Sequence, residues 1–214
     1  MGVPKPDPNE QFQGVEDIRL YRHENKTKFL ATSVNYSGRA TNAMLMGDYD
    51  TETFSLKNVK VLESPGENIR EKNWIPFVTD REYFVYSWFP FQMGVVEENK
   101  LNITHKYDIK SPYNGAIVRG SSNILSIDNE YVTLVHMSID GTLPKQYYHM
   151  LLWMNSEYKP YATSTLFYFD RYGPEFCLSI ERKKGNFVFW ISRYDRNPTT
   201  VSIKENEIKK YPLG

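Results

Sequence analysis

Short apolar runs alternate with polar stretches along most of the chain. Four of these runs have the length of a β-strand and are rich in β-branched and aromatic residues, which favour strands. They span residues 28–34, 83–88, 131–136 and 186–192. Each follows a polar, turn-like stretch, and before each turn lies a further strand-like segment, at 16–21, 73–78, 121–126 and 175–180. We find no amphipathic helix of ten or more residues, so the pattern predicts an all-β protein built from antiparallel hairpins.

The spacing of the four aromatic runs predicts how these hairpins are organised. The runs begin at residues 28, 83, 131 and 186, so one hairpin recurs about every 50 residues. A strand repeat of roughly 40–50 residues is typical of β-propeller blades, which usually have four antiparallel strands. A sandwich with irregular hairpins is the alternative. We predict a tail or linker over residues 1–13, which carries three prolines, and a β-propeller domain over residues 14–214.

Composition excludes several classes of protein. The 214 residues include 26 Lys plus Arg and 26 Asp plus Glu, and zero net charge argues against a non-specific nucleic-acid binder. The one cysteine, Cys177, rules out an internal disulfide framework and a cysteine-cluster zinc site, and we expect it to pack in a strand. No run approaches the roughly 18 apolar residues of a membrane span, and the first residues lack the apolar region of a signal peptide. We therefore expect a cytoplasmic protein.

Two acids and an arginine precede the first strand and form the first candidate site. A carboxylate beside a guanidinium stays ionised and oriented, whereas a carboxylate in a closed aromatic pocket can act as an acid. The residues are Glu16, Asp17 and Arg19. The alternative is a structural Asp–Arg pair that closes a turn.

A second candidate site is an aromatic wall for sugar binding. Asn73, Trp74 and Trp88 lie in two segments rich in Trp, Pro and Phe, and sugars bind flat aromatic surfaces while amide and carboxylate groups take their hydroxyls. The alternative is that these aromatic side chains form a packed core.

A third group suits a phosphate or a sugar diphosphate, because arginine, serine and histidine together hold such anions. The candidates are Arg119, Ser121, His136, Tyr148 and His149. A surface loop and two hydrogen-bonded histidines are the alternative. The histidine spacing fits no zinc site, and we predict neither a metal nor a cofactor.

A last pair of acids, Glu175 and Asp195, could supply further carboxylates to the same site or could be turn residues. P-loop, GxGxxG, HExxH and GxSxG motifs are absent, so nucleotide hydrolysis on a P-loop, Rossmann hydride transfer and α/β-hydrolase chemistry have no support.

Taken together, these motifs resemble the five-bladed β-propeller superfamily of glycosidases, β-mannoside phosphorylases and β-mannosyltransferases. The matching blocks span roughly residues 14–203, and the chain looks most similar to uncharacterised propeller proteins that accompany glycosyltransferases in bacterial and large-virus gene sets. The blocks are GxEDxR at 14–19, KNWxPF at 72–77, YxWxPF at 86–91, RGSS at 119–122, YYH at 147–149 and YDRNP at 194–198.

The resemblance implies a carbohydrate-active enzyme that transfers or phosphorolyses a glycosyl group with inversion. Asp17 would be the single general acid, Arg19 would orient it, and Arg119, His136 and His149 would hold phosphate or sugar phosphate. The implied partners are a carbohydrate, a sugar phosphate or a nucleotide sugar.

Two departures from the family keep other functions open. Ile18 replaces the family's proline, and the family's first blade has no counterpart before Gly14. A partner chain or an upstream domain could complete the propeller. A non-catalytic glycan-binding propeller and a protein-interaction propeller are therefore the alternative functions.

Overall fold

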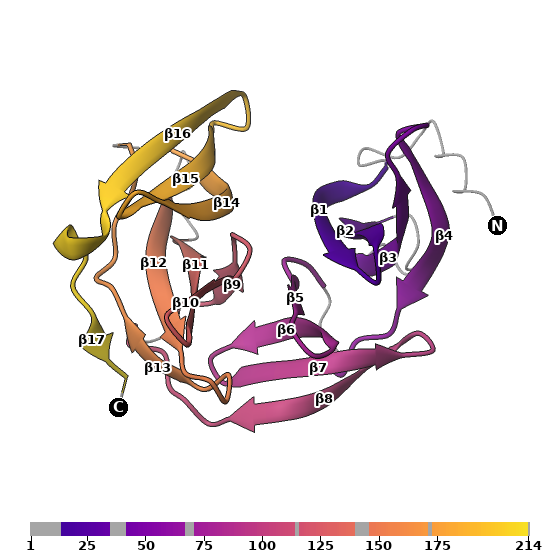
Figure 1. Ribbon diagram of the computed structural model, residues 1–214, viewed down its shortest axis with the longest axis horizontal. Helices are drawn as coiled ribbons and strands as arrows, with labels where there is room; N and C mark the ends of the chain where they lie inside the picture. The colour runs from indigo at the N-terminus through magenta and orange to yellow at the C-terminus, as the bar shows by residue number, and fades with distance from the viewer. Residues whose placement is uncertain are drawn as a thin grey trace. The chain divides into compact units, whose positions relative to one another are not determined.

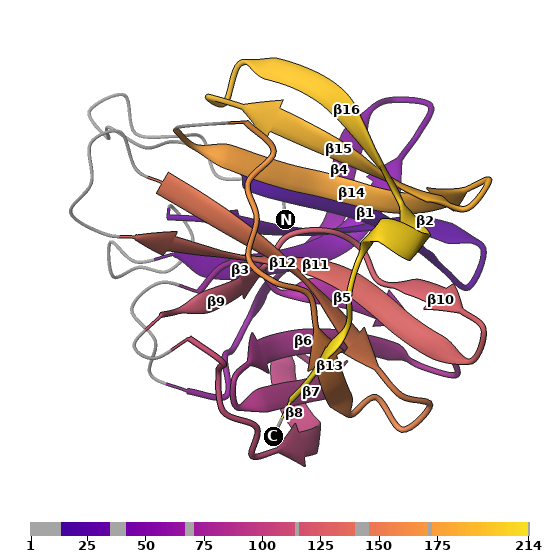
Figure 2. The same cartoon turned by 90° about the vertical axis from the view of Figure 1, so that its left-hand side faces the viewer.

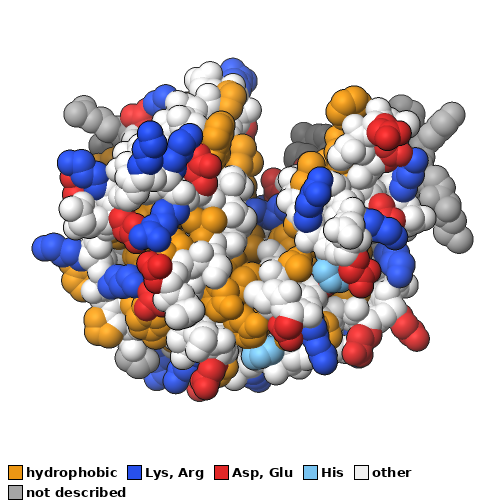
Figure 3. All heavy atoms as spheres, in the orientation of Figure 1, with side chains coloured by type: hydrophobic (Ala, Val, Ile, Leu, Met, Phe, Trp, Pro, Cys, Tyr) orange, Lys and Arg blue, Asp and Glu red, His pale blue; other side chains and the backbone are white. Residues whose placement is uncertain are grey.

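The computed structural model describes residues 14–34, 42–66, 71–113, 116–139, 146–170 and 173–213. Over these ranges the regular structure is β-strand apart from one 3₁₀ helix, η1 (Glu205–Glu207), and none of it is a helix that could cross a membrane. The tail predicted at residues 1–13 lies outside the described residues. Basic and acidic side chains are interspersed on the face shown in Figure 3, as the balanced composition leads us to expect.

The strands form four antiparallel sheets that follow one another along the chain (Figures 1 and 2). In the first two sheets the strands lie in chain order, four in each. The first sheet contains β1 (Glu16–His23), β2 (Lys26–Ser33), β3 (Ala43–Asp50) and β4 (Ser55–Leu62). The second contains β5 (Ile75–Val78), β6 (Glu82–Trp88), β7 (Phe91–Glu97) and β8 (Lys100–Tyr107).

The third and fourth sheets depart from four strands. The third has the order β10-β11-β12-β13-β17, with β9 also paired to β11, and the fourth has the order β14-β15-β16. The third contains β9 (Val118–Gly120), β10 (Leu125–Ile127), β11 (Glu130–Ile139), β12 (Gln146–Met154), β13 (Pro160–Thr163) and β17 (Tyr211–Pro212). The fourth contains β14 (Glu175–Lys183), β15 (Asn186–Arg193) and β16 (Asn197–Lys204). The predicted four-stranded blade therefore describes the first two sheets only.

All four predicted hairpins are confirmed. They are β1–β2, β5–β6, β10–β11 and β14–β15, each antiparallel. Three of them close through two-residue turns in which both residues have positive φ, at 24–25, 128–129 and 184–185. This is the geometry of type I′ turns, whose twist matches that of the flanking strands.

The chain divides into two compact units. The first contains residues 1–86 and 93–104, and the second contains residues 87–92 and 105–214. Each has its own apolar core. Leu30, Met46, Trp74, Phe84 and Leu101 are buried together in the first unit. The core of the second unit lies between the third and fourth sheets and includes Leu134, Leu151, Cys177, Phe187 and Phe189. Cys177 is buried and packs in this core, as predicted.

The segment after β16 holds the third and fourth sheets together within the second unit. It passes through η1 and pairs as β17 with β13, beside which it lies in Figure 1. Lys210 Nζ donates to Glu130 Oε2 at 2.6 Å and lies 5.1 Å from the centre of the Trp153 ring. This segment thus adds β17 to the third sheet, and the fourth sheet consists of β14, β15 and β16.

Candidate functional site

Asp17 lies on a β-bulge at the beginning of β1. The pairing with β2 shifts between Glu16 and Arg19, and Asp17 has a φ of 52°. Glu16 and Asp17 are exposed, while Arg19 is half-buried. Bulges redirect side chains and are common beside active sites. The bulge therefore presents the Asp17 carboxylate to solvent at the start of a strand.

Trp74 is a core side chain of the first unit. It is 1% exposed, its Nε1 donates to Glu71 Oε2 at 3.0 Å, and its ring meets Tyr86 edge-on at 5.5 Å. The buried Glu71 carboxylate satisfies the indole N–H, so the whole ring can leave water. The neighbouring Asn73 is also buried, with a φ of 61° and an Oδ1 that has no hydrogen-bond partner among the described residues.

Trp88 is buried as well, with 1% of its surface exposed and its ring 6.0 Å from that of Phe91. Of the two interpretations that the sequence left open for Trp74 and Trp88, a sugar-binding wall or a packed core, the burial of both side chains favours the packed core. Both indoles belong to packed apolar surroundings, where a ligand has no access to a ring face.

The expected phosphate-binding residues differ in how far they are exposed to solvent. His136 is buried, and its Nδ1 lies 2.7 Å from Ser121 Oγ. Arg119 pairs with His136 across β9 and β11 and is half-buried. Ser121 itself is fully buried. His136 is thus a hydrogen-bonded core histidine, the structural alternative, and Arg119 is the member of the group whose charge is nearest solvent.

His149 is sealed inside the second unit. It is 0% exposed, its ring centre lies 4.8 Å from that of Phe169, and neither ring nitrogen has a hydrogen-bond partner among the described residues. Burial lowers its pKa to about 3, so the imidazole is neutral at pH 7. A neutral, inaccessible imidazole does not bind phosphate, and the assignment of His149 to a phosphate site is wrong.

Glu175 is the buried carboxylate of the second unit. It is 3% exposed and accepts hydrogen bonds from the backbone N–H groups of Phe169, at 2.8 Å, and Asp170, at 2.5 Å. Its Oε2 lies 3.9 Å from His149 Nε2. Burial raises the pKa of the Glu175 carboxyl, although the two backbone donors oppose this effect. Asp195, by contrast, is an exposed turn residue between β15 and β16, with a φ of 53°.

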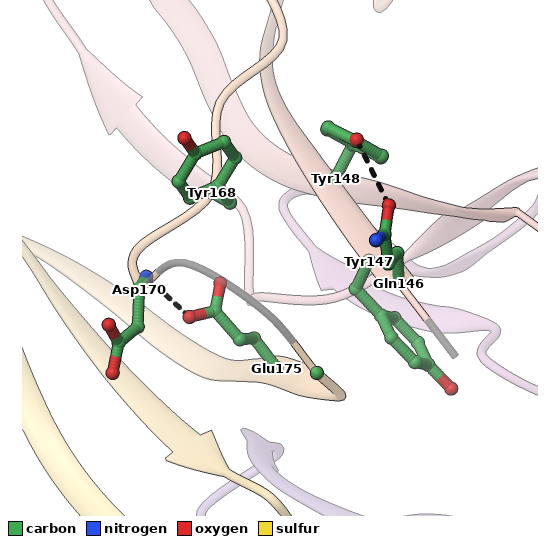
Figure 4. A pocket seen from close by; sticks show the side chains of 7 residues that line it. Gln146, Tyr147, Tyr148, Tyr168, Asp170 and Glu175 are labelled. Atoms are coloured by element: carbon green, nitrogen blue, oxygen red, sulfur yellow. Dashed lines mark hydrogen bonds between the residues drawn. The ribbon is translucent and has the colours of Figure 1, made fainter. Parts of the chain in front are cut away.

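A small cleft opens above Glu175 (Figure 4), which we call the tyrosine pocket. Its cavity volume is about 10 Å³, room for about one water-sized group. The pocket is lined by Gln146, Tyr147, Tyr148, Tyr168, Asp170, Gly173 and Glu175. Of these, sequence reasoning found Tyr148 and Glu175. The sequence analysis did not select the other lining residues for this site; the aromatic and acidic segment at residues 167–170 is the signal that could have indicated Tyr168 and Asp170.

Gly173 shapes the loop that carries Glu175 into the pocket. Its φ is +118°, and a Cβ at this position would lie 2.2 Å from the Tyr194 ring. Only glycine adopts this positive φ readily and has no Cβ to clash with the Tyr194 ring. Among the described residues, no group of three or more His, Cys, Asp and Glu side chains is arranged to hold a metal ion.

Comparison with known proteins identifies the fold. No protein-family model matches the sequence, and no curated protein matches it. The structure is similar to that of β-1,2-mannobiose phosphorylase from Listeria innocua in complex with β-1,2-mannobiose, with a TM-score of 0.60 and 12% identity over 94% of this chain. It is also similar to an exo-1,5-α-L-arabinanase from a bovine ruminal metagenomic library, with a TM-score of 0.53 and 11% identity over 95% of this chain.

These similarities confirm the predicted fold class and the predicted structural resemblance. The protein is an all-β propeller, structurally similar to the five-bladed glycoside hydrolases and phosphorylases. The chain spans 61% of the length of the phosphorylase and 79% of the arabinanase. At 11–12% identity the likeness establishes the fold and not the activity.

Proposed function

We propose that the protein acts on carbohydrate, transferring or phosphorolysing a glycosyl group with inversion. The observation that carries this proposal is a fold shared with two carbohydrate-active enzymes, one of them in complex with a mannobiose. The exposed Asp17, presented by a bulge at the start of β1, supports it because a general acid must reach the substrate's glycosidic oxygen.

Each proposed residue has a defined task. In phosphorolysis a phosphate oxygen bonds to the anomeric carbon as the glycosidic C–O bond breaks. Asp17 gives its proton to the departing oxygen, and in the synthetic direction its carboxylate takes a proton from the acceptor hydroxyl. Arg19 orients the carboxylate. Arg119 remains the candidate for the phosphate, since His136 is hydrogen-bonded and His149 is sealed from solvent.

A second function, a non-catalytic glycan-binding propeller, is favoured by the same two histidines. An enzyme that uses phosphate needs several groups to hold it, and of the three expected ones His136 is hydrogen-bonded and His149 is fully buried. The tyrosine pocket supplies aromatic, amide and carboxylate groups that suit sugar hydroxyls without any phosphate.

Product formation separates the two functions. The purified protein is incubated with nucleotide sugars and sugar 1-phosphates, together with acceptor sugars, and products are followed by mass spectrometry. Asp17→Asn removes the acid, while Glu24→Gln alters an exposed acid in the β1–β2 turn and serves as the matched control. Glycosyl transfer predicts turnover that is lost in Asp17→Asn and kept in Glu24→Gln.

Turnover that persists in Asp17→Asn contradicts the proposed mechanism. Saturable sugar binding by folded protein, without product from any donor, favours the glycan-binding function. Folded protein that shows neither turnover nor sugar binding would favour a protein-interaction propeller.

A further inference from the structure

The tyrosine pocket has a definite charge character. In Figure 4 the Glu175 side chain reaches between Tyr168 and the backbone of Asp170, whereas the Asp170 carboxylate is turned away. Asp170 Oδ2 accepts a hydrogen bond from Arg193 Nη1 at 2.8 Å, so its charge is balanced outside the pocket. None of the seven lining residues is Lys, Arg or His. Glu175 is therefore the ionisable group that faces the space.

The group behind Glu175 does not offset this negative charge. His149 Nε2 lies 3.9 Å from Glu175 Oε2, too far for a hydrogen bond, and the imidazole is neutral because it is fully buried. The two backbone donors, Phe169 and Asp170, fix the orientation of the carboxylate without adding a full positive charge. The positive charge that acts on Glu175 is Arg193, which pairs with the Asp170 carboxylate, so an anion entering the pocket would meet two carboxylates and one guanidinium.

The remaining lining groups favour hydroxyl-bearing ligands. Tyr168 is 54% exposed and meets Tyr148 edge-on, with ring centres 6.3 Å apart. The Tyr148 hydroxyl donates to Gln146 Oε1 at 3.3 Å, which places a phenol and an amide side by side. Such groups pair with sugar hydroxyls, and an exposed tyrosine ring offers an apolar face to a sugar's C–H surface.

The size of the cleft limits what it can hold. Its cavity volume of about 10 Å³ is room for about one water-sized group. The cleft can therefore take one sugar hydroxyl, while the sugar ring lies outside it, against the exposed Tyr168 ring.

From this geometry we infer that the tyrosine pocket binds one uncharged terminal pyranose, one hydroxyl of which donates to Glu175, and that it excludes sugar phosphates. The inference deepens the proposed function and rests on it, because it takes the ligand to be a carbohydrate. It assigns the pocket to a neutral sugar and places any phosphate group elsewhere.

Binding measured without turnover tests the inference. A panel of neutral methyl pyranosides and the matching sugar 1-phosphates is titrated into the full chain and followed by ligand-observed NMR and calorimetry. We expect at least one neutral glycoside to bind, with its 1-phosphate about tenfold weaker or more. Glu175→Gln and Tyr168→Ala should each weaken the neutral ligand by about tenfold, the loss expected for a hydrogen bond to a charged group or for a contact face.

Matched variants keep the result interpretable. Glu181→Gln, further along β14 than Glu175, should bind like the wild type. Tyr168→Phe keeps the ring and should retain most of the affinity. Thermal unfolding of each variant shows whether it is folded, and Tyr168 is exposed enough to be replaced even if Glu175→Gln does not fold.

Three outcomes would overturn the inference: no neutral glycoside binds to folded protein, the 1-phosphates bind as tightly as the neutral sugars, or Glu175→Gln and Tyr168→Ala both bind like the wild type. Turnover that depends on Asp17 but is accompanied by any of these results would leave the proposed function standing and refute this inference alone. Neutral-sugar binding at the pocket without turnover would refute the proposed glycosyl transfer and sustain the inference.

Discussion

Replacing His149 by phenylalanine should change how the stability of the second unit depends on pH. His149 is 0% exposed, packs against the rings of Phe167 and Phe169, and has no hydrogen-bond partner on either nitrogen among the described residues. A phenylalanine keeps the aromatic contacts and removes two buried polar atoms. We expect the free energy of unfolding of His149→Phe to lie within about 1 kcal/mol of the wild-type value at pH 7, because the gain from removing two unpaired polar atoms offsets the cost of fitting the larger ring.

The acid range gives the larger and more diagnostic effect. Burial lowers the pKa of His149 to about 3, against about 6.5 in the unfolded chain. The unfolded state therefore binds a proton that the folded state does not, so the stability from this group is present above pH 6.5 and is lost as the pH falls toward 3. The loss amounts to about 1.4 kcal/mol per pH unit, or roughly 3 kcal/mol between pH 6.5 and 4.5.

Glu175 acts in the opposite direction and must be separated from this effect. Burial raises the pKa of its carboxyl, so its contribution is fully present below the unfolded value of about 4.3 and is lost as the pH rises through the folded value. Between these limits the pH dependence of stability from Glu175 partly cancels that from His149. The Glu175→Gln variant lacks the Glu175 contribution, so the His149 contribution can be measured alone.

Urea unfolding from pH 7 to pH 4.5 on four proteins isolates the histidine. The proteins are the wild type, His149→Phe, Glu175→Gln and the double variant. The Glu175→Gln protein should lose stability on acidification about 1.4 kcal/mol per pH unit more steeply than the double variant. Equal slopes for these two proteins would refute the burial argument, and a loss above about 3 kcal/mol in His149→Phe at pH 7 would show that the imidazole has a stabilising partner.

Three further predictions concern stability. Glu82→Ala should destabilise the first unit by about 2–3 kcal/mol in urea unfolding. The Glu82 carboxylate is only 16% exposed, accepts a hydrogen bond from Tyr21 and pairs with Lys28, so its loss leaves this lysine unpaired. An unchanged urea midpoint would contradict this prediction. Trp74→Phe should lower the free energy of unfolding by about 1–3 kcal/mol in thermal unfolding, because the buried Glu71 carboxylate loses the hydrogen bond that it accepts from the indole N–H; a smaller loss would show that this hydrogen bond contributes little. Lys210→Met should lower the free energy of unfolding by no more than about 1 kcal/mol at pH 7, because the ion pair with Glu130 is half-exposed. This difference should shrink as the pH falls through the pKa of Glu130, which the hydrogen bond from Lys210 holds below its usual value.

The hairpins could be predicted because their signals are local. The two-residue turns at 128–129 and 184–185 carry Asp-Asn and Lys-Gly, and each lies between runs of alternating or continuous apolar residues. Turn chemistry and strand pattern act on the same few residues, so sequence alone determines where the chain reverses. The fold class then follows from the recurrence of one hairpin.

The sequence could not decide between a sugar-binding wall and a packed core for the tryptophans, because their burial depends on partners in three dimensions. Trp74 is buried whole because Glu71, itself buried, accepts its N–H, and an unsatisfied indole would remain partly exposed. The tyrosine pocket also depends on contacts between segments that are brought together only by folding. Tyr168 and Asp170 reach Glu175 through a loop held by backbone bonds to the carboxylate, and no periodicity records that contact.

The cost of burying Glu175 beside His149 connects stability to function in the second unit. A carboxylate with a raised pKa and an imidazole without hydrogen bonds each oppose folding, and packed apolar side chains of similar size would be more stable. Such local conflicts concentrate at sites where chemistry or binding requires them. A Glu175→Gln, His149→Phe double variant should therefore be at least as stable as the wild type at pH 7 and yet bind the neutral sugar about tenfold more weakly. If the double variant is more stable and binds as well as the wild type, the buried pair has no part in ligand recognition.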